Sequence, residues 1–402
     1  MDLNSAAQKI FKRKIPDIFL RFVLIGSTIF SNKIILILFA YFLSEIQYNL
    51  FNKAYYTASI LILFGTLGFD FAINRINFSL KTVFIAVLVN VLFSIIILYF
   101  VSEPFTNLFQ LISVFIYSLF ASLGGIFTFQ HLFQGRIKTY LNLMLINALL
   151  HLSIVPFITI LEADIFFLFP LITFFWFMIG LPGFIKKNSS GGKNFVVLYK
   201  LGLSTFVINS AVAFALVSDK YLVNHNFPIE TANAYTFAWG LIVPLLYIGN
   251  VVEKLIYGST SKDEVQVFKK SFLLLFVLVI AYSISLLAVV NLIPSALPKS
   301  IDHLQLKQII NYMIIGYSLF AVINFPVNGF LFKFAETLKQ KKIAIAYLVT
   351  IFLFSILFIV FNGGTALTHY QTLLMVIWTF IFLLLIIKTA IVFLPLRKTS
   401  DL

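Results

Sequence analysis

The sequence predicts an all-α polytopic membrane protein with about 12 transmembrane helices in two six-helix halves around a central cavity. Hydrophobic residues make up 61% of the 402 residues and charged residues only 11%, which is less charge than a soluble domain needs. Apolar stretches of roughly 20 residues recur along the chain, and this is the length of a helix that crosses a bilayer. The basic residues gather in alternate gaps between these stretches.

The apolar stretches place the spans in chain order. The predicted ranges are 19–43, 54–77, 82–101, 105–129, 140–161, 164–185, 197–221, 232–256, 271–293, 306–331, 342–361 and 368–395. The second span is interrupted by Asp70 and Asn74, and the eighth contains Pro244. All gaps between spans are short, so we expect no extramembrane domain.

The basic residues predict the orientation of every loop. Both terminal tails and five alternate gaps hold 24 of the 29 Lys and Arg residues, with Lys388 counted in the C-terminal tail. The other gaps hold only four, including Lys220, and Lys33 lies inside the first span. Because cytoplasmic loops are enriched in Lys and Arg, we expect both termini in the cytoplasm of a bacterium and the spans in its inner membrane. The net charge of +14 then reflects topology and attraction to anionic membrane lipids, and not nucleic-acid binding.

This topology predicts the outcome of a labelling experiment. The chain contains no cysteine, so single cysteines at Ser190 and Thr365 provide specific labelling sites. An impermeant thiol reagent should reach Ser190→Cys only from the cytoplasmic side and Thr365→Cys only from the periplasmic side. Labelling of both variants from one side would exclude the predicted span order.

A division into two halves is predicted near the middle of the chain. The basic segment KKNSSGGK at 186–193 is the best linker candidate, and it gives halves of 1–193 and 194–402. A shift of 180 residues superposes the first span on the seventh, and Ala54, Tyr55 and Ala58 then match Ala234, Tyr235 and Ala238. Repeats of six spans share one orientation, so their axis runs along the membrane normal, with a cavity between the halves.

Several classes of enzyme are disfavoured by the sequence. The string Gly191-Gly192-Lys193-Asn194 lacks the first glycine and the hydroxyl residue of an ATP-binding loop. The five histidines show no metal-ligand spacing. We therefore expect no cofactor, no metal and no catalytic activity, and an energy source in an ion or substrate gradient.

Polar residues at membrane depth are the candidate functional residues, because each costs about 2.5–3.5 kcal/mol on insertion scales. Lys33 lies near the middle of the first span and is expected to line the cavity, although a long side chain can also reach an interface. The spacing of a second group of polar residues predicts a polar stripe on one helical face of the second span. Its members are Thr66, Asp70, Asn74 and Asn77, with Arg75 beside it. The alternative for this group is an interfacial Asp–Arg anchor.

Two further candidates lie in the second half. Asp219 and Lys220 lie at the outer end of the seventh span. They either take part in the transport cycle or anchor the helix end at the membrane interface. Pro326 in the tenth span removes one helical hydrogen bond, and the side chains of Asn324 and Asn328 can satisfy the freed carbonyl. This pattern predicts a hinge.

Two segments resemble a known family of transporters. The string from Leu43-Ser44-Glu45 through Tyr55 to Gly65-x-x-Gly68-x-Asp70-x-Ala72-x-x-Arg75 is similar to the first helix pair of Wzx-type polysaccharide flippases. These belong to the multidrug/oligosaccharidyl-lipid/polysaccharide exporter superfamily. Val217 to Leu222, followed by Ala234-Tyr235 and Ala238, resembles the seventh and eighth helices. The sequence departs from the family at Asn52-Lys53-Ala54, where a glycine often precedes the second helix.

The resemblance implies a substrate and partners. The substrate would be an oligosaccharide repeat unit on a polyprenyl pyrophosphate, as in O-antigen or capsule synthesis, and a polysaccharide polymerase and a chain-length regulator would be partners. Because a pyrophosphate needs cationic and polar partners at low dielectric, the expected contacts are Lys33, Arg75, Asn74 and Lys220. Asp70 and Asp219 are the expected coupling acids. The alternatives are an ion-coupled drug or metabolite antiporter and a polysaccharide polymerase; short outer loops disfavour the polymerase.

Overall fold

The computed structural model describes residues 34–75, 77–102, 107–133, 136–161, 164–188, 194–258, 264–292, 298, 301–333, 337–362 and 370–393. Almost all of them lie in α-helices, and no β-strand occurs among them. The helices before residue 190 are α3 (Ile34–Phe42), α4 (Glu45–Thr66), α5 (Phe69–Arg75), α6 (Leu80–Ser102), α7 (Leu108–Phe133), α8 (Ile137–Leu152), α9 (Ile154–Leu161) and α10 (Ile165–Asn188). Those that follow are α11 (Phe195–Asn226), α12 (Ile229–Gly258), α13 (Glu264–Leu292), α14 (His303–Lys333), α15 (Thr337–Asn362) and α16 (Tyr370–Phe393).

The chain is an all-α polytopic membrane protein. Eight helical segments of the described residues are long and apolar enough to cross a membrane, with α8 and α9 together forming one of them, and α11 adds a ninth if its two segments, bent by 48°, count as one span. Every predicted span overlaps a helix of the structure. The number of 12 stays a prediction, because α3, α15 and the pair α4 and α5 are not among the spans counted in the part of the chain that the structure describes. In α4 this has a physical reason, since polar residues such as Asn49, Asn52 and Thr57 are buried on it.

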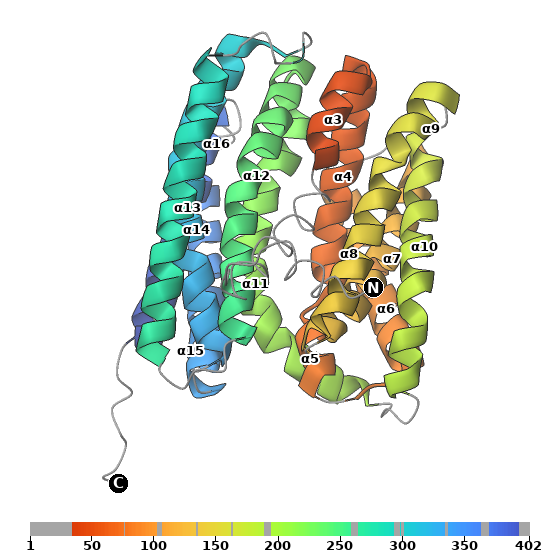
Figure 1. Ribbon diagram of the computed structural model, residues 1–402, viewed down its shortest axis with the longest axis vertical. Coiled ribbons are helices and arrows are strands. Elements are labelled where there is room, and N and C mark those ends of the chain that lie inside the picture. Colours follow the sequence, from red (N-terminus) through yellow and green to blue (C-terminus); the bar gives the residue numbers. More distant parts are fainter. Residues whose placement is uncertain are drawn as a thin grey trace, which may run out of the picture.

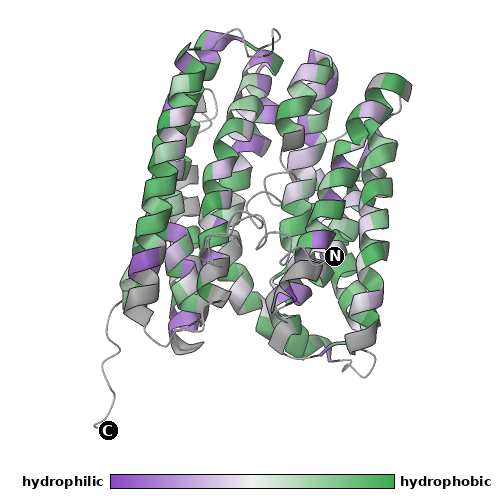
Figure 2. Ribbon diagram, viewed as in Figure 1, coloured by the Kyte–Doolittle hydropathy of each residue, from purple (hydrophilic) through white to green (hydrophobic). Residues whose placement is uncertain are grey.

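The outer helices expose apolar side chains over most of their length. On α6 the side chain of Phe100 is 81% exposed, and on α13 that of Leu292 is 78% exposed. Figure 2 shows hydrophobic residues along most of the outer helices, with hydrophilic residues interspersed among them and near their ends. Apolar surfaces of this extent are rare on soluble monomers, and hydrocarbon is the solvent that matches them.

The helices form two groups with the same packing pattern. In Figure 1, α3 to α10 lie on one side and α12 to α16 on the other, and α11 runs from beside α5 in the first group into the second. In the first group α4 packs on α6 and α7, and α7 packs on α6 and α10; in the second, α12 packs on α13 and α14, and α14 packs on α13 and α16. The groups meet where α11 contacts α4 and α5, and where α12 contacts α3 and α4. The predicted repeat and the boundary at 193 and 194 stay predictions.

A sharp turn divides the predicted second span. Between α4 and α5, Leu67 and Gly68 have positive φ angles of 39° and 70°, a conformation that favours glycine. The turn lies against α11, because a Cβ atom on Gly68 would stand 2.5 Å from the carbonyl oxygen of Gly202. Two glycines therefore allow the backbones of the two helix groups to approach each other here.

The turn makes the predicted polar stripe wrong as one helical face. Thr66 ends α4, and Asp70 and Asn74 belong to α5. Asn77 follows α5 and is exposed. Spacing of i, i+4, i+8 and i+11 aligns side chains only on an unbroken helix, and Gly68 ends that regularity.

Alanine at position 68 is expected to destabilise the protein. The left-handed conformation costs a side-chain-bearing residue about 1–2 kcal/mol, and the contact with Gly202 adds to this, so Gly68→Ala should lower the free energy of unfolding by about 2 kcal/mol or more. Thermal unfolding in detergent measures the effect. Gly125→Ala on α7 is the control, because a Cβ atom there meets nothing within 4 Å. Equal stability of the two variants would contradict this account of the turn.

Candidate functional site

Two oppositely charged residues are buried side by side in the second helix group. Asp219 is 1% exposed and Lys220 is 0% exposed. The predicted seventh span ended at 221, whereas α11 continues to Asn226. The expectation of a helix-end position is therefore wrong, because another turn of helix follows the pair and side chains of α12 and α14 contact it.

The Lys220 ammonium is surrounded by acceptors and aromatic rings. Its Nζ lies 2.8 Å from Asp219 Oδ1 and donates hydrogen bonds to the Tyr317 hydroxyl and to the Leu216 carbonyl. The ring centroid of Trp239 lies 3.8 Å from Nζ. A buried ammonium needs this number of partners, because removing it from water costs several kcal/mol.

The Asp219 carboxylate is equally well paired. Its Oδ2 accepts a hydrogen bond of 2.7 Å from the Tyr235 hydroxyl and a longer one of 3.4 Å from Tyr317. Its Oδ1 accepts one of 2.9 Å from the Lys220 backbone N–H. Tyr317 accepts from the lysine and donates to the aspartate, so three side chains form a closed ring of hydrogen bonds. The site is electrically neutral as long as both charges are present.

Aromatic residues from three helices enclose this centre. The ring of Tyr317 on α14 lies 4.9 Å from that of Trp239 on α12 and 4.6 Å from that of Trp378 on α16. Gly316 lets Trp378 approach, because a Cβ atom there would lie 2.5 Å from the indole. Apolar walls lower the local dielectric, which strengthens the interaction between the two charges.

A band of polar side chains leads from this centre to the first helix group. Asn224, one turn after Lys220, donates a hydrogen bond of 3.1 Å to the Thr236 hydroxyl. On the same helix as Thr236, Asn233 accepts a hydrogen bond of 3.4 Å from Asn52 of α4. It also donates one of 3.2 Å to the Glu45 carbonyl. The polar residues Thr236 and Asn233 of α12 thus lie between the ion pair and the place where α12 meets α4.

The predicted coupling acids do not form one cluster. Asp70 is half-buried in the first turn of α5, just after the turn that contacts Gly202 on α11. Asp219 lies 17 residues beyond Gly202 on the same helix, which is about 25 Å along an α-helix. Lys33 lies outside the described residues, and so do the side chains of Asn74 and Arg75, so their role in substrate binding stays a prediction.

A second buried lysine corrects the assignment of the C-terminal tail. Lys388 lies inside α16 and is 1% exposed, so it is not a cytoplasmic tail residue. Its Nζ donates to the side-chain oxygens of Asn324 and Asn328, the latter at 2.7 Å. These amide oxygens therefore bind an ammonium, and α14 runs through Pro326 as one helix. The hinge at Pro326 stays a prediction.

The two buried lysines also change the charge distribution between the loops. Lys388 leaves the cytoplasmic set and Lys220 leaves the outer set, so the split of loop charges becomes 23 to 3. The direction of the predicted asymmetry is the same.

Sequence reasoning missed the aromatic partners of the ion pair. Tyr235 appeared only as a repeat match, and Trp239, Tyr317 and Trp378 were not considered. One signal was present: the chain has only three tryptophans, and two of them pack on Tyr317. Buried tyrosine and tryptophan side chains usually find a hydrogen-bond partner, so several of them on facing helices indicate a polar interior.

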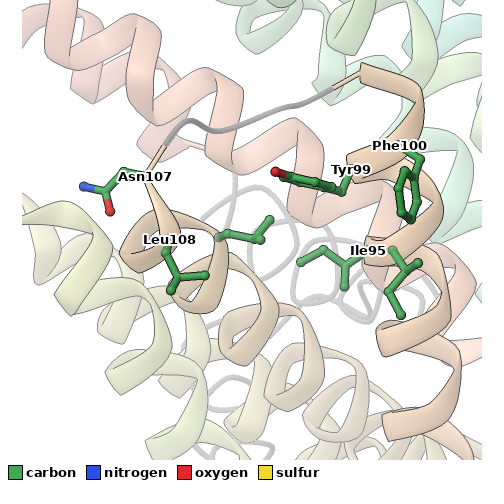
Figure 3. A pocket seen from close by; sticks show the side chains of 7 residues that line it. Ile95, Tyr99, Phe100, Asn107 and Leu108 are labelled. Atoms are coloured by element: carbon green, nitrogen blue, oxygen red, sulfur yellow. The ribbon is translucent and has the colours of Figure 1, made fainter.

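Two cavities are formed by the first helix group. One has a volume of about 310 Å³ and lies between the end of α6 and the start of α7, where Tyr99, Phe100 and Asn107 line it (Figure 3). The other, of about 230 Å³, includes Gln47, Gln110 and Asp164. Both are lined only by residues between 43 and 166. The central cavity between the halves stays a prediction.

Neither a metal site nor a relative identifies the protein. Within the described ranges, no three His, Asp or Glu side chains come together as metal ligands would. No family model, curated protein or solved structure matches the chain.

Proposed function

We propose that this chain moves polyprenyl-pyrophosphate-linked oligosaccharides across the inner membrane of a bacterium by alternating access. The observation that carries the proposal is the Asp219–Lys220 pair, which is fully buried in a membrane protein. Ionisable residues at this depth are expensive and mark substrate or ion routes. The substrate class comes from the resemblance of two chain segments to polysaccharide flippases.

The ion pair can exchange partners during transport. In the described state Lys220 is neutralised by Asp219 at 2.8 Å. A pyrophosphate group that displaces the carboxylate would take the ammonium as one counter-ion for its negative charges, and the released Asp219 would take up a proton so that the carboxylate does not stay buried as a charge without a partner. Substrate binding and proton binding are then linked through one pair of residues.

The helix arrangement supports a movement of one helix group against the other. Alternating access requires two packed units that rock about a shared interface. The repeated packing pattern supplies the units, and α11, bent by 48° between Ile208 and Ala211, joins them. The small residues Gly68 and Gly202 form one contact of this interface.

One observation favours an antiporter of organic cations as the second candidate. The Lys220 ammonium lies over the rings of Trp239 at 3.8 Å and Tyr317 at 4.8 Å. Aromatic rings around a cation are also the way in which proteins recognise organic cations. In this alternative the lysine would occupy the site until a cationic drug or metabolite replaced it.

Export in cells distinguishes the candidates. In a strain that lacks its own flippase, the wild-type chain should restore surface polysaccharide, and Lys220→Met at equal protein level on a blot should not. Membrane vesicles that contain the chain should take up no more ethidium than vesicles without it. Ethidium uptake without restored export would favour the antiporter, and normal export by Lys220→Met would remove the ion pair from the proposed mechanism.

A further inference from the structure

The second buried lysine is held like a bound ion. Lys388 Nζ lies 2.7 Å from the side-chain oxygen of Asn328 and also donates to that of Asn324. The two asparagines are four residues apart on α14, so they face the same side of that helix. All three side chains are buried.

Charged groups around Lys388 come from two other helices. Glu253 on α12 is 7% exposed, and its carboxylate attracts the ammonium electrostatically. Lys339 on α15 donates a hydrogen bond of 2.7 Å to the carbonyl of Val392, which lies one turn after Lys388 on α16. The site therefore receives one negative charge from α12 and two oxygen ligands from α14, while the lysine that supplies the cation belongs to α16.

This arrangement has the properties of a monovalent-cation site. Amide oxygens directed at one point replace the hydration shell of a cation, and one nearby carboxylate balances one positive charge. Inside a bilayer such a group of oxygen ligands is costly when it is empty, because unpaired buried acceptors lose their hydrogen bonds to water. The lysine side chain brings a cation that cannot leave.

We propose that the side-chain oxygens of Asn324 and Asn328 form a monovalent-cation site whose permanent occupant is the tethered ammonium of Lys388. The site is separate from the Asp219–Lys220 pair and does not depend on the transported substrate. One consequence is that it exchanges no ion with solution in the wild-type chain. A second is that the protein without the tether should bind a free ammonium ion or K⁺ there.

Removal of the tether tests the proposal. Lys388→Ala should unfold at a lower temperature than the wild type in choline chloride, and ammonium chloride or potassium chloride at equal ionic strength should restore part of the loss. The rise should continue with the logarithm of the cation concentration, as expected for an ion that binds only the folded state. The wild type should show no such difference between salts.

Two further variants complete the test. Lys388→Ala combined with Glu253→Gln should lose the response to ammonium and potassium, because the balancing charge is gone. Lys388→Met fills the space without a charge, so it should be less stable than the wild type in every salt. A Lys388→Ala protein whose unfolding temperature ignores the cation would overturn the proposal. So would a Lys388→Met protein as stable as the wild type, which keeps the test decisive if Lys388→Ala does not fold.

Discussion

Loss of either charge of the Asp219–Lys220 pair should destabilise the protein far more than loss of both. Asp219→Leu leaves the Lys220 ammonium buried among aromatic rings without its counter-ion, and Lys220→Met leaves the carboxylate alone. Each change should lower the free energy of unfolding by about 3–5 kcal/mol. The double variant should recover most of this loss, because apolar residues of similar volume often replace a buried ion pair without a penalty.

Unfolding of the four proteins in one detergent measures this coupling as a double-mutant cycle. Lys339→Met is the matched control, since Lys339 is only half-buried and its ammonium donates to the carbonyl of Val392; its loss should cost about 1 kcal/mol. Additive effects of Asp219→Leu and Lys220→Met would show that the two charges do not depend on each other. The exchange of partners proposed for transport would then have no basis.

Substrate binding should become tighter as the pH falls. If the pyrophosphate takes Lys220 and the released Asp219 takes a proton, each bound substrate carries one proton into the site. By linkage, the dissociation constant should then fall by up to about tenfold for each unit of decrease in pH. Fluorescence titration of the purified chain with a labelled polyprenyl pyrophosphate oligosaccharide between about pH 6 and 8, within the range in which proteins tend to be most stable, measures the slope.

Asp219→Asn provides the comparison for this slope. Its amide is neutral at every pH, so Lys220 is already available and the variant should bind the labelled lipid with little dependence on pH. Any slope that remains in the variant belongs to the phosphate groups of the lipid and is subtracted. Equal slopes for the wild type and Asp219→Asn would contradict a role of Asp219 in proton uptake.

The helices could be predicted because the bilayer imposes one length and one composition on every span. The positions of α6, α7, α10 and α13 follow directly from apolar stretches. The break at Leu67 and Gly68 could not be predicted, because the residues around it keep helical spacing and only the contact with Gly202 explains the turn. Local sequence carries no record of a contact with a helix more than a hundred residues away.

The candidate site could be predicted only in part for a similar reason. Asp219 and Lys220 were found because adjacent opposite charges are rare in apolar segments. Their partner Tyr317 was not, since the chain has 17 tyrosines and hydropathy does not tell which of them faces an ion pair. Lys388 was assigned to the tail because it lies near other basic residues, and its burial depends on two asparagines about sixty residues earlier.

Transport in a purified system tests the central proposal most directly. The chain is reconstituted into vesicles with a fluorescent polyprenyl pyrophosphate oligosaccharide, and a membrane-impermeant quencher added outside reports the fraction of label on each side over time. The variant Asp219→Leu/Lys220→Met is the control, because it should be folded but unable to bind the pyrophosphate. The proposal predicts that the wild type moves the label across the bilayer and that the double variant leaves it in place. Movement by the wild type no faster than in vesicles with the double variant would contradict the proposed function.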